Sequence, residues 1–173
     1  GDFHSPKIHV IPEGGANGLG VMGAGEIIDE IDEPFDHIIT SIGTGTTMAG
    51  LIARLAGRNN VLGLSSLKGE FIHTAFKSLL LTMNISHSNY TVNADYHFGG
   101  YGKTSPELID FINKMKEEIE ILFDPIYTGK ALFGVWNMIT NGKFDGQTLI
   151  FLHTGGLQGI AGHNQKSPQK IHI

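Results

Sequence analysis

The chain contains no cysteine, which excludes disulfide bonds and thiolate metal sites. It also has no run of about 18 or more apolar residues and no charged-then-apolar leader, the marks of a membrane helix and of a secretion signal. Positive charge is scarce, since 12 Lys and Arg stand against 17 Asp and Glu, and a nucleic-acid binder would need a basic surface. We therefore expect a cytoplasmic protein that binds neither membranes nor nucleic acid.

The nine histidines lack a metal-binding pattern. None stands in a His-x-x-x-His or similar spacing with a carboxylate nearby on one predicted helix, so we predict no metal site. Hydrophobic residues make up 40% and charged residues 17% of the 173 residues, which is typical of one folded globular domain and not of a disordered segment.

Short apolar runs alternate with helical stretches along the chain. The apolar runs predict strands at residues 8–11, 37–42, 61–64, 121–123 and 149–153. The helical stretches cover about residues 19–31, 46–56, 70–84, 106–118 and 127–141. Residues 86–105 show no period and predict a loop, and the residues from 164 onward predict a tail. This alternation is typical of an α/β fold, a three-layer arrangement of a parallel sheet with helices on both faces.

Glycine is abundant, and much of it falls in turns that follow predicted strands. The polar or glycine-rich turns are Pro12–Gly20, Gly43–Thr47, Asp124–Gly129 and His153–Gly156. In open α/β sheets, ligands bind at the carboxyl ends of the strands. We therefore expect these four turns to converge on one site.

The strongest local signal is Gly43-Thr44-Gly45-Thr46-Thr47, between a buried strand and a helix. The glycines allow close backbone approach, the helix start offers free N–H groups, and the threonines add hydroxyl donors, which together predict a phosphate site. The segment has no lysine, so it is not a Walker A loop, and it does not complete a Gly-x-Gly-x-x-Gly pattern. A tight strand-to-helix turn with packing glycines is the alternative.

Three further segments offer side chains to such a site. Tyr127 and Thr128 stand at a predicted helix start, where the phenol could transfer protons and the hydroxyl could meet a ring nitrogen. Packing of the tyrosine and capping by the threonine is the plainer interpretation. Tyr101 lies within Gly99–Gly102, which is either backbone close to a ligand or a surface turn. His153 could line a pocket, whereas a hydrogen-bonded structural role is more common for a lone histidine.

Five motifs occur in one order along residues 8–159. They are Pro12-Glu13-Gly14-Gly15-x-Asn17, Gly43-Thr44-Gly45-Thr46-Thr47-x-Ala49-Gly50, Gly99-Gly100-Tyr101-Gly102, Asp124-Pro125-x-Tyr127-Thr128-Gly129-Lys130 and His153-Thr154-Gly155-Gly156. Together they resemble the 1-aminocyclopropane-1-carboxylate deaminase and D-cysteine desulfhydrase group of fold-type II pyridoxal-phosphate (PLP) enzymes. The resemblance implies a lyase or deaminase of a small amino acid, built as a homodimer around the large PLP-binding domain.

The resemblance also implies roles for single residues. Gly43–Thr47 would hold the PLP phosphate, and Thr128 would face the pyridine nitrogen. Tyr127 would lie near the substrate as a proton-transfer group or stacking partner, and Tyr101 would approach the substrate. The deaminase branch carries a glutamate in place of Thr128. A carboxylate there would keep the pyridine ring protonated, so a neutral threonine fits the desulfhydrase branch better than ring opening of the cyclopropane.

The lysine that carries PLP as an internal Schiff base has no counterpart here. In the resembled family it lies well before the phosphate loop, whereas only 42 residues precede Gly43, and none of the lysines stands in a similar context. We therefore expect residues 1–173 to be part of a PLP-binding large domain, without its N-terminal part and small domain, and inactive on their own.

Other interpretations of the short chain stay open. It could be a short relative that binds a phosphate ligand without catalysis, or a second chain could supply the remaining part. From another functional class, a non-catalytic phosphate- or nucleotide-binding α/β module also fits the loop at Gly43–Thr47. A sheet without its first segment would expose apolar surface, which predicts self-association.

Overall fold

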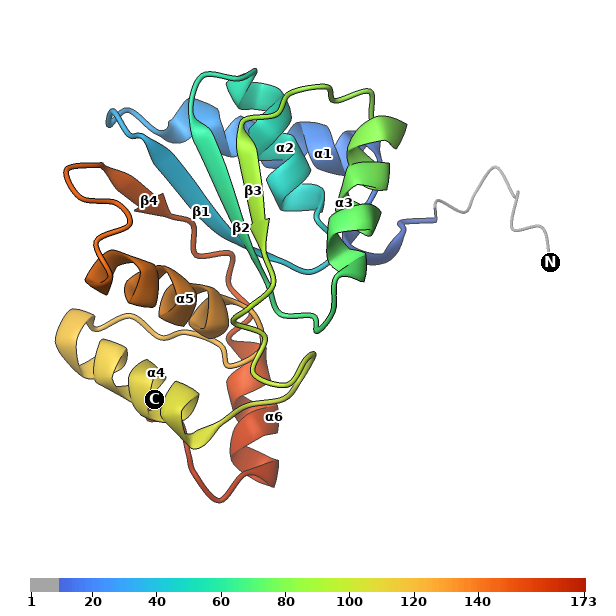
Figure 1. The fold of residues 1–173 in the computed structure, drawn as a ribbon. Helices are drawn as coiled ribbons and strands as arrows, with labels where there is room; N and C mark the ends of the chain where they lie inside the picture. The colour runs from blue at the N-terminus through green and yellow to red at the C-terminus, as the bar shows by residue number, and fades with distance from the viewer. Residues whose placement is uncertain (1–9) are drawn as a thin grey trace.

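A parallel four-stranded sheet forms the centre of the protein in the computed structural model, which describes residues 10–173 (Figure 1). Its strands lie in the order β3-β2-β1-β4. They are β1 (His37–Ile42), β2 (Asn60–Ser65), β3 (Tyr90–Asn93) and β4 (Leu149–Phe151). β1 pairs with β2 and β4, and β2 pairs with β1 and β3, so β1 and β2 are the two central strands. The apolar runs at residues 37–42 and 61–64 predicted both of them.

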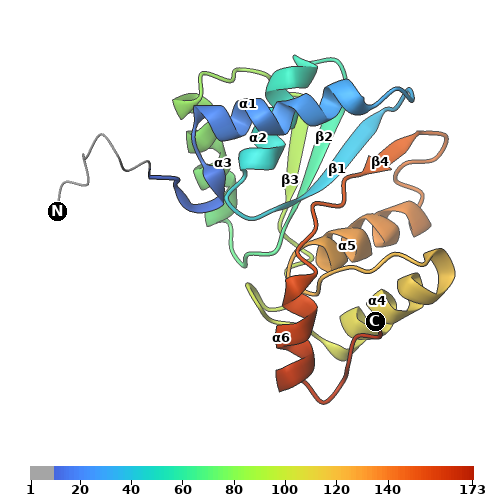
Figure 2. The same ribbon diagram turned by 180° about the vertical axis from the view of Figure 1, so that it is seen from behind.

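Helices cover both faces of the sheet (Figures 1 and 2). One face carries α1 (Gly18–Gly25), α2 (Thr46–Leu55) and α3 (Phe71–Thr82), with the short helical turns η1 (Glu13–Gly15) and η2 (Glu26–Glu30). The other carries α4 (Pro106–Ile119), α5 (Thr128–Thr140) and α6 (Gln158–Lys166). The predicted three-layer α/β fold is confirmed. Between residues 10 and 173, no helix is both long and apolar enough to cross a membrane.

The strand β1 supplies core side chains to both helical layers. Ile38 and Ile42 pack with α2 and α3, whereas Ile39 points to the opposite face and packs with α5. All three are fully buried. A strand covered on both faces reads as a continuous apolar run, which explains why residues 37–42 were predictable.

The predicted strand at residues 121–123 is wrong, the predicted strand at residues 8–11 can be checked only at two of its residues, and one strand escaped prediction. Residues 121–123 form no strand, because Phe123 packs against α4 and α6 while the carbonyl of Leu122 bonds to the ring of His153. Val10 and Ile11 also lie in no strand, and the rest of the predicted strand 8–11 lies outside the described residues. The missed strand β3 is a short edge strand with mixed polar residues, inside the segment predicted as a loop.

The predicted tail from residue 164 is also wrong, because the C-terminal residues fold back onto α4. The side chain of Asn113 donates to the carbonyl of Lys170 and accepts from the backbone N–H of His172, both at 2.9 Å. Ile171 is buried in the cluster between α4 and α6. One internal amide and one isoleucine therefore order a segment whose own sequence is polar.

The strand order reverses at β1. The chain runs from β1 to β2 and then to β3 on one side, and β4 returns on the other side of β1. In open α/β folds, the crevice beyond the carboxyl ends of two such strands is where ligands bind. The ends of β1 and β4 are therefore the place in this fold where a site is expected.

Close approach of α1 and α2 depends on a glycine. A Cβ atom at Gly50 would lie 2.5 Å from the carbonyl oxygen of Val21 and 2.7 Å from the nitrogen of Gly25. We predict that Gly50→Ala lowers the free energy of unfolding by about 1–3 kcal/mol, since the helices would have to separate. Urea denaturation measures the change.

The matched control is Gly23→Ala, at an exposed position of α1 where an added Cβ meets nothing within 4 Å. Alanine is the better helix former by about 1 kcal/mol, so this change should be neutral or stabilising. Equal effects of the two substitutions would contradict the close packing of α1 on α2.

Candidate functional site

A polar cavity of about 280 Å³ lies beyond the ends of β1 and β4. Each of the four predicted turns contributes to its wall. The first contributes Glu13 and Gly14, the second contributes Gly43–Thr47, and the others contribute Tyr127 and Thr154. The expected convergence of the turns is therefore confirmed, and the cavity occupies the position where the strand order reverses.

The loop Gly43–Thr47 leads directly into α2. Gly45 has a φ of +89° and stands immediately before the first helical residue, and a Cβ there would come within 2.7 Å of the ring of Phe76. This left-handed turn brings the start of α2, with its unpaired N–H groups, to the cavity. The hydroxyls of Thr44 and Thr46 lie 3.1 Å apart on the same loop. The segment combines a helix N-terminus with hydroxyl donors, which is the donor set that an anion requires.

Glycines also allow the neighbouring segments to close on this loop. A Cβ atom at Gly14 would overlap the hydroxyl of Thr44, and one at Gly43 would lie 3.2 Å from the ring of Tyr127. The cavity is therefore bounded by a backbone turn on one side and by an aromatic ring on another. Neither neighbour could approach so closely if these positions carried side chains.

Tyr127 is the aromatic wall of the cavity. Burial raises the pKa of its phenol to about 12, and the neighbouring Tyr101 adds to the rise. The group is therefore neutral at pH 7 and offers a hydrogen-bond donor rather than a base. Tyr101 does not line the cavity itself. Its exposed ring packs edge-on against Tyr127 with centroids 5.8 Å apart, so it stands at the rim.

The buried carboxylate of Asp124 fixes the position of Tyr127. Its Oδ1 accepts from the backbone N–H groups of Ile126 and Tyr127, each at 2.8 Å. Its Oδ2 accepts from the backbone N–H of Thr128 at 2.8 Å and from the Thr128 hydroxyl at 2.6 Å. A negative charge at a helix start also compensates the helix dipole, so the carboxylate caps α5 electrostatically as well.

These bonds place Thr128 outside the cavity. Thr128 is fully buried and does not line the cavity. Its hydroxyl donates to the carboxylate of Asp124 and accepts from the backbone N–H of Asp124. The predicted contact between Thr128 and a cofactor ring has no support in this geometry. The capping role, which the sequence offered as the alternative, is the one that the contacts describe.

His153 has a structural role. Its Nδ1 accepts from the backbone N–H of Gly155 at 3.1 Å, so its Nε2 donates to the carbonyl of Leu122 at 2.7 Å. The next residue, Thr154, lines the cavity instead. The family resemblance implied that His153–Gly156 flank the pocket floor, and Thr154 is the residue of that segment that lines the cavity. Glu13 and Ser41 also line the cavity, although sequence reasoning gave neither an individual role.

The lysines of residues 10–173 lie outside the cavity wall. Lys130, which follows the Tyr-Thr-Gly segment, is buried and donates to two backbone carbonyls of the loop before Tyr101. Within the same residues, no three side chains of the metal-binding types come together.

Several known proteins are similar to this chain in sequence or in structure. A protein of Pyrococcus horikoshii, provisionally named 1-aminocyclopropane-1-carboxylate deaminase, is 32% identical over 92% of this chain and 53% of its own length. A bifunctional D-cysteine desulfhydrase/1-aminocyclopropane-1-carboxylate deaminase of Arabidopsis thaliana is 30% identical over 89% of this chain and 43% of its own. The crystal structure of a homologue of ACC deaminase superposes with a TM-score of 0.76 and 30% identity, over 91% of this chain and 52% of that one.

The chain thus spans about half the length of the curated relatives that it matches. A sequence model of the family described as "Pyridoxal-phosphate dependent enzyme" matches residues 4–155, which is most of the chain. The phosphate-type loop, the sheet topology and this match agree, and the chain belongs to the family of pyridoxal-phosphate-dependent enzymes.

Proposed function

We propose that the cavity binds PLP with the cofactor phosphate on the loop Gly43–Thr47. The observation that carries this proposal is the meeting of the α2 N-terminus with several hydroxyl groups in one polar cavity. A phosphate dianion is stabilised there by backbone N–H groups and by the positive end of the helix dipole.

The residues around the loop also suit the rest of the cofactor. Thr154 offers a hydroxyl on the β4 side of the cavity, and we propose it, in place of Thr128, as a partner for the pyridine ring. The neutral phenol of Tyr127 can donate a hydrogen bond to the cofactor or to a substrate. Bound PLP supplies an electron sink that stabilises negative charge on the reacting carbon of an amino acid.

For the whole protein, we propose a deaminase or desulfhydrase acting on a small amino acid. The names of the relatives support this class of reaction. In it, Tyr127 would act as a hydrogen-bond donor, because its raised pKa keeps the phenol protonated. Tyr101 would meet the substrate from the rim. The sequence argument for the desulfhydrase branch relied on a contact of Thr128 with the ring, which this geometry does not favour, so we propose both reactions for testing.

A first prediction concerns the phosphate loop. Thr44→Val keeps the shape of the side chain and removes one hydroxyl that lines the cavity. We expect the Kd for PLP to rise about three- to tenfold, the effect of one lost hydrogen bond. A titration followed by PLP absorbance measures the change, and adenosine phosphates are titrated in parallel.

Thr74→Val is the control, because Thr74 is an exposed threonine of α3. This variant should bind PLP as tightly as the unchanged chain does. Unaltered PLP binding by Thr44→Val would contradict the assignment of the loop. Tighter binding of an adenosine phosphate than of PLP would favour the nucleotide-binding module instead.

A second prediction concerns covalent attachment. Because no lysine of residues 10–173 lines the cavity, we expect the isolated chain to hold PLP without a bond to any one lysine. After incubation with one equivalent of PLP and reduction with borohydride, the main species should keep its mass of 18.7 kDa. A stoichiometric adduct on a single lysine would contradict this expectation and would make the chain self-sufficient in cofactor attachment.

We also propose that the chain associates with copies of itself. Leu19 and Met22 lie one turn apart on α1 and are 69% and 67% exposed, and Val10 and Ile11 are similarly exposed. Burial of Leu19 and Met22 against a second copy would favour a dimer. Light scattering should then give twice 18.7 kDa, about 37 kDa, and Met22→Glu should reduce that mass. A single species of 18.7 kDa at all concentrations would refute self-association.

A further inference from the structure

Lys130 is an ammonium group enclosed by protein. Only 1% of the residue is exposed, and its Nζ donates to the carbonyl of His97 at 2.9 Å and to that of Gly100 at 2.8 Å. Burial of an amine is costly unless its donors are satisfied, so these two bonds determine where the side chain can lie. Both acceptors belong to the loop that carries Tyr101.

The two carbonyls also close consecutive turns of that loop. The oxygen of His97 accepts from the N–H of Gly100 at 3.0 Å, and the oxygen of Gly100 accepts from the N–H of Lys103 at 3.1 Å. The amine of Lys130 therefore bridges both turns at their first residues. The loop includes Phe98 with a φ of +53°, an uncommon conformation for a residue with a side chain. An anchor from outside the loop helps to maintain such a backbone.

Tyr101 is the second residue of the second turn, and its ring packs on Tyr127. Tyr127 and Lys130 are three residues apart at the start of α5, so they lie on the same side of the helix. The first turn of α5 thus provides both the ring that Tyr101 contacts and the amine that holds the Tyr101 backbone. The loop therefore contacts the start of α5 at two points, the ring of Tyr127 and the amine of Lys130. The Asp124 carboxylate fixes the backbone at that start.

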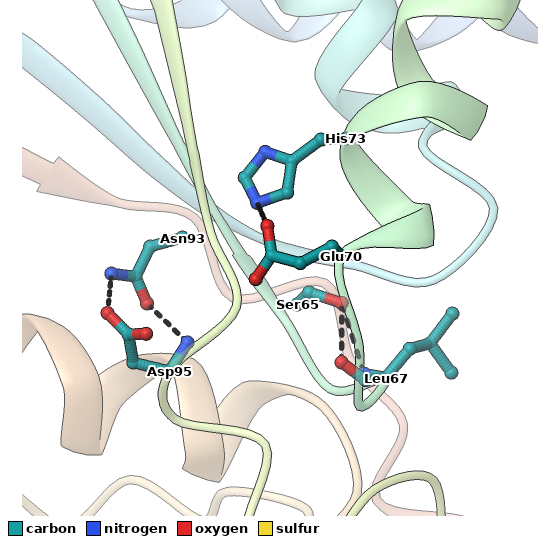
Figure 3. Close-up of polar contacts among 6 residues, drawn as sticks. All are labelled: Ser65, Leu67, Glu70, His73, Asn93 and Asp95. Atoms are coloured by element: carbon teal, nitrogen blue, oxygen red, sulfur yellow. Dashed lines mark hydrogen bonds and ion pairs between the residues drawn. The ribbon is translucent and has the colours of Figure 1, made fainter.

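On the other side, the Tyr101 loop faces the end of β2. An ideal Cβ at Gly100 would lie 3.5 Å from the Cβ of Lys68. The turn before Lys68 is fixed by Ser65, whose Oγ accepts from the N–H of Leu67 at 3.0 Å (Figure 3). Asn93 similarly fixes the turn after β3, donating to Asp95 at 2.7 Å (Figure 3). These local bonds order the neighbouring turns, whereas Lys130 supplies bonds from α5 to the Tyr101 loop.

We propose that Lys130 is a positioning residue whose amine holds the Tyr101 loop against α5 and thereby keeps Tyr101 on Tyr127 at the cavity rim. Its relevance to the reaction rests on the proposed function, but the contact itself needs no cofactor. An open loop would release the amine into water, and the closed loop buries it again. The proton affinity of the amine therefore differs between the two arrangements.

Burial lowers the pKa of Lys130 to about 8, against a partial opposing effect of the Asp124 carboxylate. In the open loop the amine has the usual value of about 10.5. The open loop therefore binds the proton more tightly, so raising the pH from about 8 toward 10.5 stabilises the closed arrangement. A neutral amine still has two N–H donors for the two carbonyls.

Other ionisable groups face the same region. Asp124 lies before α5, Lys68 follows β2, and Lys103 follows Tyr101 in the loop. His97 is the group that needs a control, because its Nδ1 accepts from the N–H of Gly99 at 2.9 Å and would lose this bond on protonation. Tyr127 stays protonated through this pH range.

Hydrogen exchange of the Gly100 and Lys103 amides tests the proposal on the chain without PLP. After correction for intrinsic rates, their protection should rise about tenfold between pH 7 and pH 9, as expected for pKa values of about 8 closed and 10.5 open. NMR of lysine labelled with ¹³C at Cε should show one lysine titrating near pH 8. Protection that is constant over this range would overturn the proposal without any mutant.

The variant Lys130→Met shows whether the pH dependence of protection comes from Lys130 or from His97. It should abolish the rise with pH and lower protection of the two amides about tenfold at pH 9, with the amide of Ile39 in β1 as an internal reference. Lys103→Met, at an exposed lysine of the same loop, should leave both properties unchanged. A pH dependence that persists in Lys130→Met would assign it to His97, and an equal loss at Ile39 would indicate general destabilisation; either would overturn the proposal. PLP affinity is measured separately, so a failure of the proposed function would not be confused with either result.

Discussion

Four hydrogen-bond donors at the start of α5 converge on the buried carboxylate of Asp124. The free energy of burying that charge is offset only while all four remain in place, so the first turn of α5 has little freedom. Tyr127 is consequently held beside Gly43, and Lys130 is directed at the Tyr101 loop. The segment after β4 also packs closely on this carboxylate, because a Cβ at Gly156 would lie 3.1 Å from the Asp124 carboxyl carbon.

The sheet supplies the second part of the cavity. Reversal of the strand order at β1 leaves a crevice between the ends of β1 and β4, and the left-handed Gly45 directs α2 into it. An anion site at this position needs no charged side chain, since backbone N–H groups and hydroxyls provide the donors. This explains how an acidic chain can present a site for a phosphate.

The features that the sequence predicted correctly depend on local rules. A doubly buried strand such as β1 appears as a continuous apolar run, and Ser105 before Pro106 marks the start of α4, with its hydroxyl accepting from Leu108. Two of the turns that form the cavity, Gly43–Thr47 and His153–Gly156, were predicted for the right reason, because parallel strands end at one edge. The other two follow segments predicted as strands, and the described residues of those segments form no strand. Features that depend on tertiary contacts were missed. β3 exists because β2 offers it an edge, and the C-terminal segment is ordered by Asn113, which is 57 residues before its partner Lys170.

Roles within the site were harder to predict than its location. Thr128 and Thr154 both lie in turns that the sequence singled out, and only the hydrogen bonds of Asp124 direct the first away from the cavity. The sequence suggested that Lys130 caps or orients its own turn, whereas its amine bonds to two carbonyls about 30 residues earlier in the chain. Side chains whose function depends on backbone partners far away in the sequence leave no local pattern.

A crystal structure of the chain with PLP would test the central claim most directly. We predict that the phosphate lies at the start of α2, with its oxygens bonded to backbone N–H groups and hydroxyls of residues 43–47 and with the ring between Tyr127 and Thr154. Phosphate density in the separate cleft beside His163 and Lys166, and not at the start of α2, would contradict it.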